Sequence, residues 1–173
     1  MKPKTIRYKF LRTGLKSDSG NLTWKIGKWQ KVEGELKMCH WGLHCSKEIN
    51  QALSFVSGEI LAKVEVRGRS IVEDEKECYS EMKIIKTWNW SKEDSVALAI
   101  YAAELVIDIY EKKYPKDDRP RKAIEAAKYW LKHPTAYAAN AANAAANATN
   151  ATRKELTANI EKWLVKRIKG KSK

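Results

Sequence analysis

The sequence predicts an α+β protein, with a small mixed β-sheet domain and one short helix at residues 1–90, followed by a bundle of about four helices at residues 91–173. Three observations predict this fold class. Apolar and polar residues alternate along the first half, which is typical of half-buried strands. Apolar residues recur at helical spacing in the second half. An apolar content of 43% in 173 residues can build a folded core.

The composition is strongly basic, with 34 Lys and Arg against 21 Asp and Glu and a net charge of +13. A field of this sign attracts anionic partners such as nucleic acid, a lipid surface or an acidic protein. No apolar run approaches the roughly 20 residues that a membrane span needs, so we expect no membrane partner. The absence of a signal-peptide pattern and the three cysteines favour the cytoplasm, that of the host cell if a phage encodes the chain.

The first half combines strands with one helix. The predicted elements are strands at 6–11, 22–29, 59–67 and 82–88 and a short helix at 50–56. The alternation is clearest from Ile60 to Val66, where we expect Gly68 to end the strand. These elements predict a small mixed sheet.

The segment 39–45, CHWGLHC, is the chemically densest part of the chain. Its residue types suit zinc, but the spacing lacks the Cys-x2–4-Cys pattern of structural zinc sites, so a turn with small core residues is favoured. We therefore expect no metal and no cofactor. Two alternatives stay open, a metal site and a Cys–His nucleophile pair. The residues concerned are Cys39, His40, His44, Cys45 and Cys78.

The second half opens with a helix for which Ser91 and Asp94 form a near capping box. We expect this helix to run to about Lys113, before Pro115 ends it. Its predicted buried stripe comprises Leu98, Tyr101, Leu105 and Ile109.

A second helix follows Asp117–Pro120, because an aspartate cap followed by proline is a helix-start signal. Its predicted buried face comprises Ala123, Ile124, Ala127, Trp130 and Leu131. Its other side is basic through Arg119, Arg121 and Lys122. This side is a solvated face, or its residues form a buried network with the aspartates or are offered to a partner.

The third predicted helix starts near Thr135 and is almost pure alanine and asparagine. The asparagines fall on one narrow stripe at 100° per residue. They are Asn140, Asn143, Asn147 and Asn150. The stripe is an exposed polar face, a ladder bonded to a neighbouring helix, or a partner-recognition surface.

A capping box at 152–155 begins the last helix. We expect Leu156, Ile160, Trp163, Leu164 and Ile168 to face inward. A basic outer face is a candidate for contacts with nucleic-acid phosphates. It comprises Arg153, Lys154, Lys162, Lys166 and Arg167.

Two families share features with the chain. Residues 39–55, CHWGLHCSKEINQALSF, followed by the strand ILAKVEVRG, resemble an uncharacterised domain of phage and prophage proteins. The matching residues are Gly42, His44, Cys45, Ala52, Leu53 and Gly68. This resemblance implies no activity.

The same order of elements is similar to that of the ADP-ribosyltransferase fold. That resemblance implies Arg7 or Arg12 near the nicotinamide phosphates and a late glutamate, Glu77 or Glu81. It provides an enzymatic alternative.

Residues of about 90–150 resemble the helical domain of the putative immunity proteins of bacteria and phages. The resemblance lies in LAIYAA at 98–103, DDRPRKAIEAAKYW at 117–130 and the alanine-rich segment that follows. It implies that the chain neutralises a toxin by binding. Family members tend to carry alanine, histidine or arginine where this chain has asparagines.

These observations favour a non-enzymatic phage or prophage protein of immunity or counter-defence type, which inhibits a macromolecular partner by binding. No nucleotide-binding glycine loop, catalytic triad or paired-carboxylate motif is present, so no catalytic residues are predicted. The expected partner is a host or phage protein, alone or in a nucleoprotein complex. The alternatives are a basic nucleic-acid-binding protein and an ADP-ribosyltransferase-like enzyme.

Overall fold

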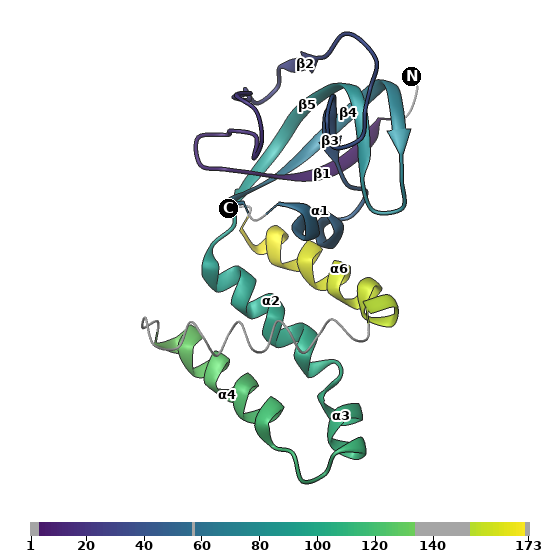
Figure 1. Cartoon of the computed structure of the whole chain (residues 1–173). Coiled ribbons are helices and arrows are strands. Elements are labelled where there is room, and N and C mark those ends of the chain that lie inside the picture. Colours follow the sequence, from purple (N-terminus) through teal and green to yellow (C-terminus); the bar gives the residue numbers. More distant parts are fainter. Residues whose placement is uncertain (1–3, 57, 134–152, 172–173) are drawn as a thin grey trace. The chain divides into compact units, whose positions relative to one another are not determined.

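The computed structural model describes residues 4–56, 58–133 and 153–171 (Figure 1). The chain divides into two compact units, Met1–Trp90 together with Val165–Lys173, and Ser91–Leu164. We call them the sheet unit and the helical unit. The predicted α+β class is confirmed, because strands fill the first half and helices the second. The assignment of separate domains to residues 1–90 and 91–173 stays a prediction.

The sheet unit contains one five-stranded sheet in which β4 and β5 form the long central hairpin (Figure 1). Its elements are β1 (Thr5–Leu11), β2 (Trp29–Lys31), β3 (Leu43–Cys45), α1 (Ile49–Phe55), β4 (Ile60–Val72) and β5 (Glu77–Asn89). The strand order is β1-β4-β5-β2, and β3 also pairs with β5. All these pairings are antiparallel, so within the described ranges the sheet is antiparallel where a mixed sheet was predicted.

Strand β4 does not end at Gly68, as predicted, but continues to Val72. Gly68 has φ +84° and lies where the register with β5 shifts between Arg67 and Ser70. A Cβ at this position would lie 2.3 Å from Ser80 Oγ. Glycine therefore lets the strand pass through a bulge and go on pairing, instead of ending it.

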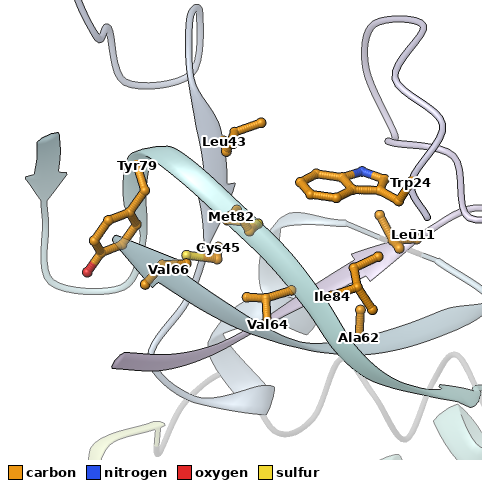
Figure 2. Close-up of a cluster of buried hydrophobic side chains, with 10 residues drawn as sticks. All are labelled: Leu11, Trp24, Leu43, Cys45, Ala62, Val64, Val66, Tyr79, Met82 and Ile84. Carbon is orange, nitrogen blue, oxygen red and sulfur yellow. The ribbon is translucent and has the colours of Figure 1, made fainter. Parts of the chain in front are cut away.

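The predicted strand at 22–29 is wrong, because only Trp29 of this range lies in a named strand. The chain turns at Gly27, which has φ +79° and donates its N–H to the Ile84 carbonyl at 2.8 Å. Trp24 is only 2% exposed and packs into the core from the loop (Figure 2). The alternation that suggested a strand thus comes in part from Leu22 and Trp24, which the loop directs into the core, whereas Ile26 is exposed.

One face of the sheet buries Phe10, Leu61 and Trp88, which are directly paired. The core cluster drawn in Figure 2 lies on the other face and under the loops that cover it. It comprises Leu11, Trp24, Leu43, Cys45, Ala62, Val64, Val66, Tyr79, Met82 and Ile84. Directly paired residues such as Val64 with Ile84, and Val66 with Met82, point to this same face. The intervening residues of β4 and β5 therefore point to the opposite face.

The helical unit begins with the predicted cap, in which Ser91 Oγ accepts the Asp94 N–H at 3.3 Å and Asp94 Oδ2 accepts the Ser91 N–H at 2.8 Å. The helices are α2 (Lys92–Glu104), α3 (Ile107–Lys113), α4 (Arg119–Lys132) and α6 (Arg153–Gly170), the last of which extends into the sheet unit. The single helix predicted up to about Lys113 is wrong, because the chain leaves helical geometry at Val106, with φ −123°. β-Branched residues such as Val106 and Ile107 are weak helix formers.

Helix α4 packs on the preceding helices through the face predicted for it. The buried cluster comprises Val96, Ile100, Ala103, Ile107, Ile124, Ala127 and Trp130. The stripe predicted for the first helix is wrong, since Ile109 is 64% exposed. Apolar residues lie on several sides of α2 and α3, and those that pack against α4 are Val96, Ile100, Ala103 and Ile107. None of the helices in the described ranges is long and apolar enough to cross a membrane.

Candidate partner-binding site

The connection between α3 and α4 forms an open hollow of about 610 Å³. The residues that line it run from Lys113 to Arg119. We call residues 108–122, which include the last turns of α3 and the first turn of α4, the α3–α4 corner. The hollow therefore coincides with the DDRP sequence on which the helix start was predicted.

Asp117 is the centre of a hydrogen-bonded network in this corner. Its carboxylate accepts the Tyr110 hydroxyl at 2.9 Å and two guanidinium N–H groups of Arg119 at 2.8 and 2.7 Å. It also accepts the Arg119 backbone N–H at 3.2 Å, one of the N–H groups that the first turn of α4 leaves without a partner inside the helix. The bonds to Arg119 and Tyr110 hold the pKa of Asp117 well below its usual range. We call Tyr110, Asp117 and Arg119 the corner network.

The remaining basic residues of the α4 N-terminus are paired as well. Arg121 binds Glu111 through two guanidinium N–H groups, one of them at 2.6 Å, and lies 3.5 Å from Asp108. Lys122 forms an ion pair with Asp118 at 2.7 Å. The predicted pairing of aspartate with Arg119 is therefore present, whereas Arg121 pairs with residues of α3. The pairing is not that of a buried network, because the Arg119 side chain is 84% exposed.

Three lysines remain at the corner without a carboxylate partner in the part of the chain that the structure describes. They are Lys112, Lys113 and Lys116, and all are exposed. Between them Tyr114 exposes 46% of its surface and packs on Tyr110, with the ring centroids 4.9 Å apart. Sequence reasoning missed these residues, because they lie between the two predicted helix signals and belong to no motif.

The other predicted binding residues are only partly described. Asn140, Asn143, Asn147 and Asn150, and the third predicted helix, lie outside the described residues. Arg153 and Lys154 are the first residues of α6, but the structure does not describe their side chains. Lys162 and Lys166 are exposed one turn apart on α6, and Arg167 is half-buried.

The cysteine–histidine segment forms a turn that leads into β3. The ring nitrogen Nε2 of His44 accepts the Cys39 N–H at 3.0 Å. Gly42 has φ +137°, and a Cβ there would lie 2.1 Å from the sulfur of Cys78. Cys39 is exposed, whereas Cys45 and Cys78 are buried. Burial raises the pKa of Cys45 to about 12, so its thiol is not activated.

No group of three or more metal-ligating side chains in the described ranges is placed to hold an ion. Gly42 and His44, which carry the resemblance in this segment, instead shape the turn and seat β3 beside β5.

Two of the residues considered for an ADP-ribosyltransferase site, Arg7 and Glu77, belong to a second network. Arg7 Nε donates to Glu77 Oε2 at 2.5 Å, and the Tyr79 hydroxyl donates to the same oxygen at 2.6 Å. Burial and the bond to Glu77 raise the pKa of Tyr79. We call these three residues the sheet network. Its polar groups bond to one another, whereas Arg12 pairs with Asp18. The enzymatic alternative stays a prediction.

Comparisons with known families agree with the resemblances to the uncharacterised domain and to the immunity proteins. Residues 5–94 match the family described as "Domain of unknown function (DUF7666)", and because this is more than half of the chain, the chain belongs to that family. Residues 86–169 match the family described as "Imm-5 like putative immunity protein". This match supports an immunity-type role at a coarse level, and such a role implies a binding partner. No curated protein and no solved structure matches the chain.

Proposed function

We propose that this DUF7666-family chain is a non-enzymatic phage or prophage protein of counter-defence type, which inhibits a macromolecular partner by binding it through the α3–α4 corner. One observation carries the proposal. The four carboxylates of the corner, those of Asp108, Glu111, Asp117 and Asp118, are engaged by its own arginines and Lys122. The surface left for a partner is therefore aromatic and positively charged.

The partner that fits this surface is a protein with an acidic patch. Unpaired lysines at a rim accelerate encounter with such a patch and select against basic partners. Tyr114 supplies an aromatic ring of the type that is enriched among the residues that dominate binding energy. The ion pairs of Arg119 and Arg121 fix the loop beforehand, which lowers the ordering cost of association.

The position of the corner also supports the proposal. Asp117, Arg119 and Arg121 belong to the sequence that carries the resemblance to the immunity family, and they are the residues that hold the loop in place. The similarity in sequence and the exposed surface therefore coincide at one site.

The experiment is affinity capture from a nuclease-treated bacterial lysate, followed by titration with the purified captured protein. Lys113→Glu/Lys116→Glu and Tyr114→Ala should each weaken binding by about tenfold or more. The matched control is Lys37→Glu/Lys47→Glu, which makes the same charge change at two exposed lysines of the sheet unit. Binding that the control abolishes and the corner variants retain would place the partner elsewhere. A captured protein whose activity is unchanged by stoichiometric binding would contradict inhibition.

Nucleic-acid binding through α6 is a second candidate, because Lys162 and Lys166 are exposed on one side of the helix. Phosphate contacts release counterions, so this binding would weaken steeply with salt. Lys162→Gln/Lys166→Gln should then weaken it and reduce the salt dependence. Affinity for nucleic acid that is insensitive to salt would contradict this candidate.

A further inference from the structure

The face of the sheet opposite to the core carries an excess of positive charge. The register assigns Lys63, Glu65 and Arg67 of β4 to this face, together with their partners on β5. Its six basic side chains are Lys4, Lys31, Lys63, Arg67, Lys83 and Lys86, against the two acidic residues Glu65 and Glu81. We call this surface the open sheet face. Its net charge is therefore four positive units.

Both acidic residues of this face are engaged. Glu65 binds Lys83 at 3.0 Å and lies 3.8 Å from Lys4. Glu81 binds Arg67 at 2.8 Å and lies 3.8 Å from Lys31. These bonds, to Lys83 and to Arg67, lower the pKa of the two glutamates, so both remain ionised at neutral pH.

One cross-strand pair on this face brings two lysines together. Lys63 lies directly opposite Lys86, so their side chains leave the sheet on the same side. Lys86 also lies over the Trp88 ring, 5.3 Å from its centroid. A phosphate group at this position would be attracted by both ammonium groups.

Beside this pair, a tryptophan and an arginine form a flat platform. The guanidinium carbon of Arg67 lies 3.9 Å from the centroid of the Trp29 ring, and the Arg67 side chain is 54% exposed. The outer side of a stacked guanidinium is a planar cation on which a nucleobase can stack. Lys83 lies 4.7 Å from the same ring centroid.

We propose that the open sheet face binds single-stranded nucleic acid, with phosphates at Lys63 and Lys86 and a base stacked on Arg67. Charge with few exposed apolar groups fits a polyanion better than a protein partner, whose interface centre would be apolar. A single strand fits better than a duplex, because only unpaired bases offer a free ring to the platform.

The test uses a fluorescein-labelled oligothymidylate of about 20 nucleotides, with anisotropy measured from about 50 to 200 mM salt. Lys63→Gln/Lys86→Gln should bind about tenfold more weakly at low salt, and its salt slope should fall by about 1.4 for two lost phosphate contacts. The variant should stay folded, because it removes a like-charge pair. Lys37→Gln/Lys47→Gln is the control with the same charge change at two exposed lysines outside this face, and it should bind as the unmodified chain does.

A second variant separates stacking from charge. Arg67→Lys keeps the positive charge and can still reach Glu81, but it lacks the planar group. Its affinity should fall by about fivefold to tenfold while the salt slope stays unchanged.

Four results would overturn the proposal. The first is no binding at the lowest salt, and the second is equal or tighter binding of a duplex of the same length. The third is full affinity of Lys63→Gln/Lys86→Gln together with a loss of affinity in Lys162→Gln/Lys166→Gln. The fourth is equal competition by polyglutamate together with unchanged affinity of Arg67→Lys. The third result would place the nucleic acid on α6, and the fourth would identify the face as a general anion surface.

Discussion

The sheet network and the corner network use the same chemistry in opposite environments. In each, a carboxylate accepts hydrogen bonds from an arginine and a tyrosine. In the sheet network the Arg7 and Glu77 side chains are 19% and 5% exposed, whereas in the corner network Asp117 is 20% exposed and Arg119 is 84% exposed. Burial of both partners makes the first network part of the fold, whereas the arginine of the second network lies on the surface, where we propose that a partner binds. Residue types alone therefore do not distinguish a buried network from one that reaches the surface.

Breaking the sheet network should have the largest effect on stability. Glu77→Leu leaves Arg7 charged and largely buried without a partner, so we expect a loss of about 3 to 5 kcal/mol in the free energy of unfolding. Urea unfolding followed by tryptophan fluorescence measures it. The double variant Arg7→Met/Glu77→Leu removes both charges and should recover most of the loss. A double variant as unstable as the single one would show that the pair is not the cause.

Gly42→Ala should destabilise the sheet unit by about 2 to 3 kcal/mol, because its new Cβ meets the buried Cys78 sulfur and its φ disfavours side chains. Thermal unfolding of the variant measures the effect. Adding Cys78→Ala should recover only the steric part. An unchanged midpoint for Gly42→Ala would contradict a role of this glycine in the fold.

Lys9 offers a pH-dependent test of burial in the sheet unit. Burial lowers the pKa of Lys9 from 10.5 to about 8, although its ammonium lies 4.6 Å from the Trp24 ring centroid, which favours the charged form. Between pH 8 and 10.5 the unfolded chain binds more protons than the folded chain, so stability should rise with pH by about 2 to 3 kcal/mol in this window.

Lys9→Met should abolish this rise and stabilise the protein at pH 7. Urea midpoints from pH 7 to 10 measure both effects. The same rise in the variant would assign it to another group.

The corner network should show the smallest effect on stability. Asp117→Asn loses the charge that holds Arg119, but the guanidinium side of this pair is exposed to solvent, so we expect only a small fall in the thermal midpoint. Binding of the captured partner should nevertheless weaken, because the loop that presents Tyr114 is no longer fixed. Calorimetry measures both quantities. A large fall in the midpoint with unchanged binding would reverse the comparison between the two networks.

Local signals determined a large part of this structure. The alternation from Ile60 to Val66 fixed the central strand, and the Ser91–Asp94 box fixed the start of the helical unit, because each depends on neighbouring residues alone. The buried side of α4 followed from its periodicity for the same reason. The prediction that Asp117 and Arg119 form a pair also came from their closeness in the chain.

Only the tertiary structure decided the rest. Trp24 belongs to a loop and packs on core residues that are distant in sequence. Gly68 lies inside a strand, where Ser80 of the neighbouring strand leaves no room for a side chain. Arg7 and Glu77 are 70 residues apart, and the antiparallel register brings them together. Which arginines remain exposed, and which lysines lack a partner, depends on where the packing of α3 and α4 places their acids. Charge and motif are written in the sequence, but burial, which decides their energetic role, is a property of the folded chain.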